Sequence, residues 1–392
     1  MKVSFDSGDP EFVADPYQTY ARLRAAGRVL PGGPGQWIFT RYDDVQRLLR
    51  DGRLGSEFPA AAHRVKLGDG PAGDFFGRIL IDRDPPDHTR LRQGMRHAFS
   101  PGSVAGLRAQ VAATVDELLA PLLDDSGFDL VPGLATPLPV LVICSLLGVP
   151  AEDVELVRPR MVDLATAFGE LTLTDEQRRA ADRAVVWLRE YVGARLGQGT
   201  AGDLLSRMLA AEADGFSRQD TVDNAIFLFF AGFETTTSLI ANGTVALLTR
   251  PDQFERLRRD PSLIPTAVEE LLRFDSPVQM SMRLVREPFV ADGTKIRPGR
   301  VAVLLLGSAN RDEQVFPDPD QLDVGRHPNP HVAFGGGHHY CLGAPLARLE
   351  ASLVLDRLIH RFSCIELTGP PIRRPHPSIR SFRSVPLTAK PA

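Results

Sequence analysis

The sequence is short of cysteine, with only Cys144, Cys341 and Cys364 among its 392 residues. Three widely spaced cysteines cannot build the disulfide framework of a small secreted protein, and they fit a reducing, cytoplasmic environment. A charge excess is also missing, because the formal net charge is only −4. The composition therefore gives no reason to expect a nucleic-acid or polyanion partner.

Long hydrophobic runs are missing as well. The longest runs, Leu138–Pro150 and Ala225–Gly232, fall short of the roughly 20 apolar residues that a membrane-spanning helix needs. The acidic, interrupted start of the chain, MKVSFDSGDPEFVADPYQTY, lacks the basic and then apolar pattern of a signal peptide. These absences predict a soluble protein of the cytoplasm that has no membrane contact.

What the chain does have is enough apolar sequence for a large core, since 43% of its residues are hydrophobic. The pattern predicts a mainly α protein with small β-sheets. Residues 1–88 mix helical periodicity with short strands such as GQWIFTRY, residues 89–274 are largely helical, and residues 275–392 open with strands and turns (FVADGTKIRPGRVAVLLLG). A helix over about Leu342–Phe362 and a terminal strand, PLTAK, follow. The Gly- and Pro-rich stretch Arg53–Gly77 is predicted as a long loop.

The most unusual stretch is AFGGGHHYCLGAPLAR, residues 333–348, where Cys341 stands between a glycine-rich loop and a predicted helix. Backbone N–H groups at a helix N-terminus favour the thiolate, and glycines let the backbone approach a flat group. A buried cysteine in a turn is one alternative, and a zinc site with His331, His338 and His339 is another. Adjacent histidines point apart, however, and the spacing matches no common zinc pattern, so a single thiolate ligand of haem iron fits best.

This stretch resembles the haem-binding signature of the cytochrome P-450 family, Phe-Gly-x-Gly-x-His-x-Cys-x-Gly. The residues at the signature positions are Phe334, Gly335, Gly337, His339, Cys341 and Gly343. The resemblance implies that Cys341 is the iron ligand, that Phe334 packs beside it, and that His339 contacts a haem propionate. It also implies that the glycines, Gly343 included, keep the loop close to the porphyrin.

The helical stretch TAVEELLRF carries Glu269, Glu270 and Arg273, which by themselves could form a solvated helix face with weak ion pairs. The family's Glu-x-x-Arg motif selects Glu270 and Arg273 and implies a buried structural ion pair. Downstream, ANRDEQVFPDPDQLDVGR resembles the family's meander before the cysteine loop. The resemblance is thus continuous from about Leu263 to Glu350.

Three further side chains match positions at which bacterial members of the family contact the haem propionates. His88 and Arg92 stand four residues apart in DPPDHTRLRQGMRHAFSP, on one face of a helix that starts after two prolines. Without the resemblance they would be an ordinary basic helix face. Arg283, in VQMSMRLV, is the third, and such side chains are what two buried carboxylates require.

A helical pattern of roughly 30 residues, from about Asp220 to Thr249, is apolar enough to cross the core. In its middle, AGFETTT places a glycine and three threonines where helices disfavour them, which marks either a functional site or only a packing kink. The family's Ala-Gly-x-Asp/Glu-Thr motif is matched by Ala231, Gly232, Glu234 and Thr235. The motif implies a helix that opens at Gly232 for dioxygen, with Thr235 hydrogen-bonding the oxygen and Glu234 relaying protons.

Over the whole chain the resemblance implies one cytochrome P-450 domain, residues 1–392, with haem b between the long central helix and the helix after Cys341. The implied activity is that of a haem-dependent monooxygenase with Glu234 and Thr235 as catalytic residues. No flavin or iron–sulfur signature is present in the sequence, so electrons are expected from a ferredoxin and a ferredoxin reductase. A peroxide-using or phenol-coupling enzyme and a non-catalytic haem protein are the alternatives.

The expected substrate is a hydrophobic natural product with a polyketide or macrolide skeleton, which the enzyme would hydroxylate or epoxidise in antibiotic biosynthesis. The Gly/Ala-rich and Arg-rich composition resembles actinobacterial members that modify secondary metabolites. A terpenoid or steroid is the alternative substrate. The side chains expected to line the pocket are Phe75, Phe76, Phe168, Phe227, Leu228, Val278 and Phe382.

Overall fold

The structure of the protein is a computed structural model that describes residues 5–6, 8–124, 127–170, 172–196, 204–210, 216–376 and 378–392. Residue contacts divide the chain into two compact units. The first unit comprises Met1–Leu54, Arg108–Leu138 and Thr235–Ala392, and the second comprises Gly55–Leu107 and Pro139–Glu234.

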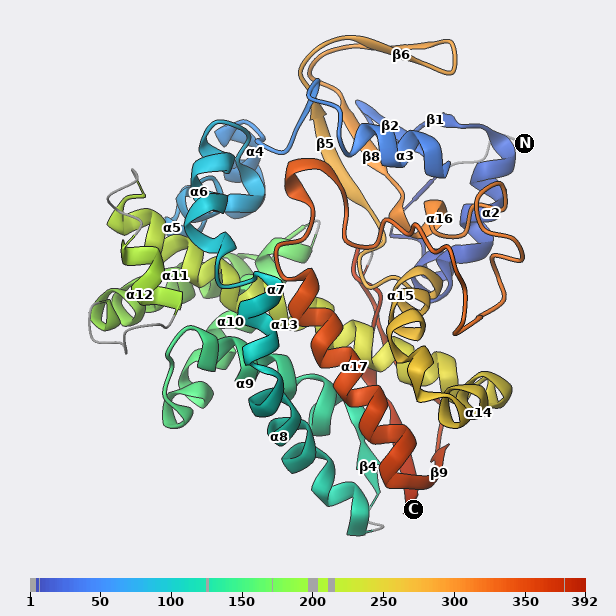
Figure 1. The fold of residues 1–392 in the computed structure, drawn as a ribbon. Helices are drawn as coiled ribbons and strands as arrows, with labels where there is room; N and C mark the ends of the chain where they lie inside the picture. The colour runs from blue at the N-terminus through green and yellow to red at the C-terminus, as the bar shows by residue number, and fades with distance from the viewer. Residues whose placement is uncertain are drawn as a thin grey trace. The chain divides into compact units, whose positions relative to one another are not determined.

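The first unit contains the small sheets and the last long helix of the chain (Figure 1). Its helices are α1 (Pro10–Ala14), α2 (Pro16–Ala26), α3 (Tyr42–Leu48), α8 (Arg108–Leu119), α14 (Pro251–Arg259), α15 (Ile264–Phe274), α16 (Leu306–Ala309) and α17 (Ala344–Arg361). Its short helical turns are η2 (Ala120–Asp124), η3 (Val131–Ala135), η6 (Pro261–Leu263) and η7 (Gly337–His339). Its strands are β1 (Val29–Pro31), β2 (Gln36–Phe39), β3 (Leu54–Gly55, which starts at the end of the first segment), β4 (Phe128–Asp129), β5 (Ser281–Val285), β6 (Phe289–Ala291), β7 (Thr294–Ile296), β8 (Val301–Leu304), β9 (Phe362–Leu367), β10 (Ile372–Arg374), β11 (Ser381–Ser384) and β12 (Pro386–Pro391).

A five-stranded sheet of order β1-β2-β8-β5-β3 has buried side chains on both faces. β8 pairs in parallel with β2 and antiparallel with β5. Because side chains alternate along a strand, Ala302 and Leu304 enter a buried cluster with α3, whereas Val303 enters another cluster with α2. The strands predicted in GQWIFTRY and FVADGTKIRPGRVAVLLLG are confirmed.

The helix that follows the cysteine loop, α17, packs against α15 and α8 (Figure 1). Its buried side chains include Leu346, Leu349 and Leu353, which recur at helical spacing. The chain then forms a three-stranded sheet of order β4-β12-β9. The predicted helix is confirmed with bounds of Ala344–Arg361, and the predicted terminal strand PLTAK lies in β12.

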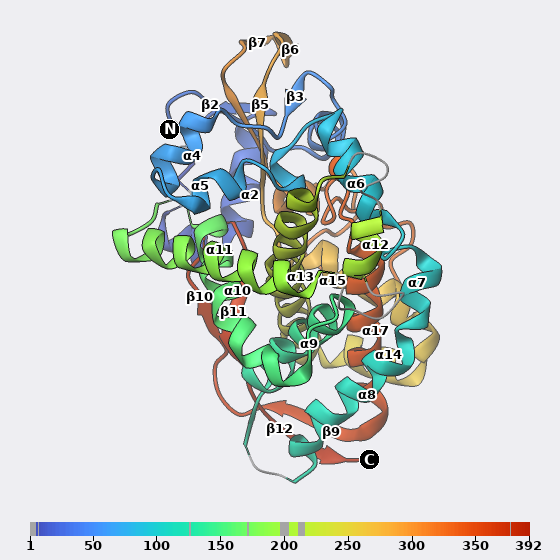
Figure 2. The same cartoon turned by 90° about the vertical axis from the view of Figure 1, so that its left-hand side faces the viewer.

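The second unit is built mainly from helices (Figure 2). They are α4 (Ala60–Leu67), α5 (Pro71–Phe76), η1 (Leu80–Asp82), α6 (Asp87–Arg96), α7 (Pro101–Gly106), most of α9 (Pro137–Leu146), η4 (Ala151–Asp153), α10 (Val154–Gly169), α11 (Asp175–Arg195) and α12 (Leu204–Ala210). α10 and α11 lie side by side. A capping box fixes the start of α11, because the Thr174 hydroxyl and the Gln177 amide each accept a hydrogen bond from the other's backbone N–H.

The stretch Arg53–Gly77 is not the long loop that its glycines and prolines predict, because it contains α4 and α5. Three alanines begin α4 and Pro71 begins α5, and both residue types suit the first turn of a helix. The carboxylate of Asp182, on α11, accepts a hydrogen bond from the N–H of Ala72 (2.9 Å) and so caps α5. This cap lies 110 residues away in the sequence, so no local signal announces it.

The central helix α13 (Arg218–Leu248) is 31 residues long, close to the predicted span. Its residues up to Glu234 belong to the second unit, and those from Thr235 onward belong to the first. In the described part of the chain, α13 alone has the length and composition of a membrane span. Its most apolar stretch is 83% buried inside the protein, however, which is typical of a core helix.

Candidate functional site

The cysteine loop, residues 332–343, turns back on itself before α17. Gly335 (φ 71°) and Gly337 (φ 66°) adopt the left-handed conformation that favours glycine. The loop brings the N–H of Cys341 to the carbonyl oxygen of Phe334 (2.9 Å). The Cys341 side chain is exposed, whereas Cys144 is buried. The sulfur of Cys341 is therefore accessible in front of a helix N-terminus.

Gly337 also lets the cysteine loop lie directly on the chain that follows α3. A Cβ atom at this position would stand 2.6 Å from the carbonyl oxygen of Leu49 and 3.2 Å from Cα of Arg50. Both obstacles are backbone atoms, so any larger residue would force the two segments apart. Glycine at position 337 thus fixes the approach of the loop to α3.

Arg348, on α17, connects the cysteine loop to α15. Its guanidinium forms a bidentate ion pair with Glu269, with distances of 2.7 Å (Nε–Oε1) and 2.8 Å (Nη2–Oε2). The same guanidinium lies 4.5 Å from the ring centroid of Phe334 and donates to the hydroxyl of Tyr340 (3.3 Å). His331 Nε2 contacts the Glu269 carboxylate as well (3.0 Å). The cysteine loop is thereby held against α15 by side chains that precede and follow the cysteine.

The surroundings of Glu269 and Arg348 favour the charged forms of both side chains. Burial raises the pKa of Glu269, but hydrogen bonds from Arg348 and His331 outweigh burial and lower this pKa to about 2. The hydrogen bond from the guanidinium to Glu269 in turn raises the pKa of Arg348. His331, which a zinc site would use, is engaged by Glu269. Within the described residues, no three His, Cys, Asp or Glu side chains gather as a metal site.

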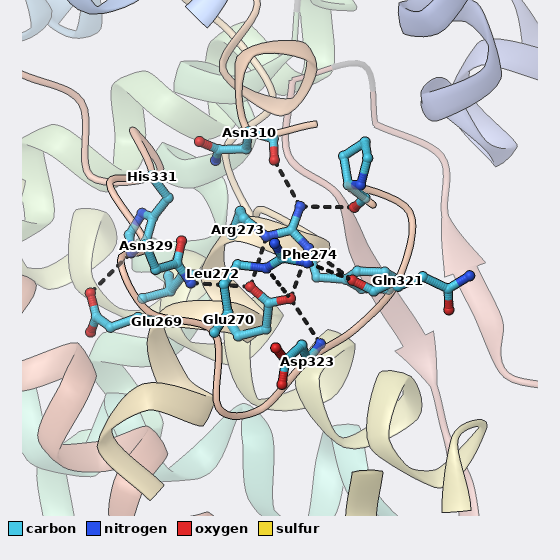
Figure 3. Close-up of polar contacts among 12 residues, drawn as sticks. Glu269, Glu270, Leu272, Arg273, Phe274, Asn310, Gln321, Asp323, Asn329 and His331 are labelled. Carbon is cyan, nitrogen blue, oxygen red and sulfur yellow. Dashed lines mark hydrogen bonds and ion pairs between the residues drawn. The ribbon is translucent and has the colours of Figure 1, made fainter. Parts of the chain in front are cut away.

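Glu270 and Arg273 form a fully buried ion pair on α15 (Figure 3). The distances are 2.7 Å (Nε–Oε2) and 2.8 Å (Nη2–Oε1), and both side chains are 0% exposed. Spacing alone would allow Glu269 to pair with Arg273. The structure instead pairs Arg273 with Glu270, the acid that the family's motif selects.

The other hydrogen-bonding positions of this ion pair are filled by the meander, residues 309–326, and by Asn329 just after it. Arg273 donates to three backbone carbonyls of this segment, those of Asn310, Pro319 and Gln321. Glu270 accepts from three donors, the N–H of Asp323 (3.0 Å) and the side chains of Arg326 (3.1 Å) and Asn329 (3.1 Å). The buried pair therefore organises the chain that leads into the cysteine loop.

His88 and Arg92 lie four residues apart on α6, as the sequence predicts, and share one face of that helix. The His88 side chain is 1% exposed, and Arg92 is half-buried. Within the second unit, Arg90 of the same helix pairs with Asp220 near the start of α13 (2.7 Å). Arg283 lies on β5 of the first unit. The contacts of these cations with haem propionates stay predictions.

The motif AGFETTT is α-helical within α13, so the helix is not interrupted at Gly232, where the resemblance implies an opening. Glu234 is 7% exposed and Thr235 is half-buried. The hydroxyl of Thr237 donates to the carbonyl oxygen of Ala135 in η3 (2.8 Å), which anchors the end of the motif. A Cβ atom added to Gly232 would meet no atom of the described residues within 4 Å apart from its chain neighbours and the backbone of the adjoining helical turns. There is consequently space beside the helix at Gly232.

Four side chains predicted to line the substrate pocket gather around Phe230 of α13 in the second unit. The ring centroids of Phe75, Phe76, Phe168 and Phe227 lie 5.6–6.3 Å from that of Phe230. Sequence reasoning missed Phe230, because all residues from 225 to 231 are apolar and no pattern distinguishes one of them. Together these rings form an aromatic cluster of five residues.

The other predicted lining residues lie outside the aromatic cluster. Leu228 is buried on α13. Val278 and Phe382 belong to the first unit, where Phe382 lies on β11 below the guanidinium of Arg373, 3.7 Å from the ring centroid. The structure thus brings together four of the seven predicted lining residues.

A polar group that the sequence did not reveal borders the aromatic cluster. Lys66, on α4, donates to the carbonyl oxygen of Phe168 (2.8 Å), and His63 of the same helix lies 3.6 Å from Asp82 (Nε2–Oδ2). Burial raises the pKa of Asp82 to about 7. His63 and Lys66 lie in the stretch that the sequence predicts as a loop, so the helix that they share could not be anticipated.

The residues of the cysteine loop fit a thiolate-bound haem. Cys341 offers one accessible sulfur, and the helix dipole of α17 favours its thiolate. Gly335 and Gly337 leave the loop without side chains at two turns, as a close approach to a planar group requires. A single soft ligand in such a loop suits haem iron better than a tetrahedral zinc site.

Comparison with known proteins agrees with this geometry. Residues 175–390 match the family model of Cytochrome P450. Vitamin D(3) 25-hydroxylase of Pseudonocardia autotrophica is 40% identical over 358 residues, which cover 88% of this chain and 86% of that protein. Polyketide biosynthesis cytochrome P450 PksS of Bacillus subtilis is 33% identical over 413 residues, which cover 99% of each protein. The crystal structure of CalO2 superposes with a TM-score of 0.93 at 33% identity and covers 99% of both chains.

Two further relatives are named as a cytochrome P450 monooxygenase and as a hydroxylase. Their similarity extends over more than nine-tenths of this chain, at 36–37% identity. The chain belongs to the cytochrome P450 family and is an oxidoreductase of the monooxygenase class.

Proposed function

We propose that this cytochrome P450 binds haem b through the thiolate of Cys341 and hydroxylates or epoxidises a hydrophobic natural product. The observation that supports the proposal most strongly is the cysteine loop, in which the Arg348–Glu269 ion pair holds an accessible sulfur in front of α17. Thiolate-ligated haem, when bound, supplies the activation of dioxygen for insertion into a C–H or C=C bond. The chain's own residues must hold the haem, the substrate and the protons.

Cations and histidines are proposed to bind the two haem propionates. The residues are His88 and Arg92 of α6, Arg283 of β5 and His339 of the cysteine loop. Buried carboxylates need charge-assisted hydrogen bonds to offset the loss of water, and these side chains can donate them. Phe334 would pack beside the sulfur, and Gly343 would leave room there, because a Cβ atom on Gly343 would stand 4.0 Å from the sulfur of Cys341.

Glu234 and Thr235 are proposed to deliver protons. Reduction of one oxygen atom to water consumes two protons, which must reach a site from which bulk water is excluded. The Thr235 hydroxyl would donate a hydrogen bond from Oγ1 to the oxygen. The Glu234 carboxyl would then resupply the proton that is used there. Thr235 comes three residues after Gly232 and so lies on the same side of α13, where a Cβ atom on Gly232 would meet open space.

The aromatic cluster supports an apolar substrate, because its rings would give a pocket beside them a wall of low polarity. The name of the Bacillus subtilis relative includes polyketide biosynthesis, which favours a polyketide or macrolide skeleton. Vitamin D(3), in the name of the relative from Pseudonocardia, is the reason to keep a terpenoid or steroid as the alternative. We further propose that the enzyme acts in the cytoplasm with a ferredoxin and a ferredoxin reductase.

A reconstituted reaction with surrogate redox proteins tests the proposal. A panel of macrolides, terpenoids, steroids and fatty acids is first screened by the shift in haem absorption, and the tightest ligand is used as substrate. We expect Thr235→Ala to bind this ligand normally and to divert electrons into hydrogen peroxide. Thr237→Ala is the matched control, because its hydroxyl contacts Ala135, and it should keep electron use coupled to product. Normal coupling in Thr235→Ala would refute the proposed proton delivery, and a panel without binding would refute the substrate class.

A further inference from the structure

The first unit contains a cavity of about 420 Å³ to which the proposed function assigns no role. It is lined by the start of α2, the last turns of α13, the end of α15 and β10. Its volume is in the range of small-molecule sites, roughly 300–1,000 Å³. None of the residues proposed to hold haem, protons or substrate lines it.

Charged side chains dominate the lining of this cavity. The arginines are Arg250, Arg311, Arg373 and Arg380, and the acids are Asp15, Asp275 and Asp320. Four positive charges against three negative ones leave a formal excess of one positive charge. A charge in a concave site is costly unless it has a partner of opposite charge. An arginine of the lining that has no carboxylate partner is therefore the one that a ligand could neutralise.

Two of the arginines share the carboxylate of Asp275. Arg380 Nε lies 2.6 Å from Oδ1 and Arg373 Nη2 lies 3.0 Å from Oδ2, while the hydroxyl of Tyr17 also donates to Oδ1 (2.8 Å). Burial raises the pKa of Asp275, but the charges of Arg380 and Arg373 outweigh burial and lower it to about 2. These groups satisfy one another and leave no need for a ligand.

Arg311 is satisfied too. Its Nη1 pairs with Asp320 (2.6 Å), and its Nε and Nη2 both donate to the carbonyl oxygen of Phe274 (3.0 and 2.6 Å). The guanidinium also stacks on the ring of Phe274, 3.9 Å from the centroid. Every nitrogen of Arg311 therefore has a partner within the protein.

Arg250 is different. Its Nη1 donates to the carbonyl oxygen of Ala246 and to the hydroxyl of Thr249 (3.2 Å each), and its guanidinium lies over Phe274 at 4.4 Å. Within the described part of the chain, Arg250 forms no ion pair with a carboxylate. Burial and the charge of Arg311 lower its pKa, against weaker attraction from Asp275 and Asp252. Arg250 is thus the lining arginine that no carboxylate pairs with in the described residues, whereas Arg311, Arg373 and Arg380 each have one.

We propose that this cavity binds a small organic oxyanion, a carboxylate or a phosphate ester, on the guanidinium of Arg250. The fork of Nε and Nη2 can donate two parallel hydrogen bonds to either group, and the ring of Phe274 already orients its plane. Ala21, Val245 and Ala246 supply an apolar wall for the carbon part of the ligand. The cavity is consequently a second ligand site, independent of the haem chemistry.

Calorimetric titration of the full-length haem-loaded protein tests this proposal, with phenyl phosphate and benzoate as probes at constant ionic strength. We expect at least one probe to bind without a shift in haem absorption, and Arg250→Gln to weaken that binding about tenfold or more, since it removes a charge-assisted hydrogen bond. Arg259→Gln is the control, because this arginine is exposed on α14 and does not line the cavity. The probe that binds more tightly identifies the ester or the carboxylate as the natural chemistry.

A second variant guards against misfolding of Arg250→Gln. Gln18 lines the cavity and is exposed, so Gln18→Glu should fold normally while placing a competing carboxylate near Arg250. We expect this variant also to weaken the probe. Absence of binding in the wild type, or equal binding in the wild type, Arg250→Gln and Gln18→Glu, would overturn the proposal. Neither result would bear on the proposal that Cys341 binds the haem iron.

Discussion

Two glutamates of the first unit are buried to the same degree but differ in their surroundings. Glu270 is 0% exposed and accepts hydrogen bonds from Arg273, Arg326 and Asn329. Glu350, on α17, is 2% exposed, and its Oε2 has no hydrogen-bond partner in the described part of the chain. A buried acid with partners stabilises the fold as an anion, whereas one without them is stable only when protonated.

Removal of the Glu270 carboxylate should leave a buried guanidinium without its counter-ion. We expect Glu270→Ala to lower the free energy of unfolding by about 3–5 kcal/mol, the usual cost of breaking a buried ion pair. Urea unfolding followed by circular dichroism measures this loss. Glu255→Ala removes an acid from a half-exposed pair on α14 and should cost about 1 kcal/mol or less. Equal losses in the two variants would show that the buried pair does not organise the meander.

The protonation of Glu350 predicts how stability depends on pH. Burial raises the pKa of this carboxyl from 4.5 to about 8 in the folded protein. Between these two values the folded state keeps a proton that the unfolded state has lost, so the free energy of unfolding should fall as the pH rises from about 5 to 8. Glu350→Gln, which cannot ionise, should lack this contribution. Parallel pH profiles of the wild type and the variant in urea unfolding would contradict the prediction.

Among the elements, the cysteine loop shows most clearly what local sequence can and cannot predict. Its glycines, Cys341 and the helix that follows are local signals, so the loop and its ligand chemistry could be read from the sequence. Arg348 and Glu269 stand 79 residues apart, and no pattern linked them. The same limit explains the missed helix α5, whose cap, Asp182, comes from α11. The Arg348–Glu269 ion pair and the start of α5 both depend on contacts between segments that are distant in the sequence, so local patterns could not predict them.

The ion pair of Arg348 should control how firmly the cysteine loop holds a bound haem. Arg348→Lys keeps the positive charge but loses the bidentate geometry and the stacking on Phe334, so we expect faster loss of haem than in the wild type. Transfer of haem to an excess of a haem-scavenging protein measures the rate. Arg357→Lys is the control, because this residue of the same helix pairs with Asp116 and lies away from the loop. An unchanged rate of haem transfer in Arg348→Lys would show that the ion pair does not control how firmly haem is held.

At the scale of the whole molecule, the chain keeps the fold of CalO2 with a TM-score of 0.93, although only 33% of the residues are identical. A fold tolerates such divergence as long as the pattern and the total volume of buried side chains persist. The mainly α fold with small sheets could therefore be predicted from periodicity and from the motifs that contain Cys341, Glu270 and Thr235. The aromatic cluster could be predicted only in part, because packing selects Phe230 from several equally apolar neighbours on α13.

The central claim is that the thiolate of Cys341 binds the haem iron, and the absorption spectrum of the reduced carbon monoxide complex tests it most directly. The wild type and Cys364→Ser should both give the band typical of thiolate ligation, since Cys364 lies on β9, outside the cysteine loop. Cys341→Ser should lose that band, because a hydroxyl oxygen cannot replace the soft sulfur ligand. A thiolate-type band that persists in Cys341→Ser would contradict the account.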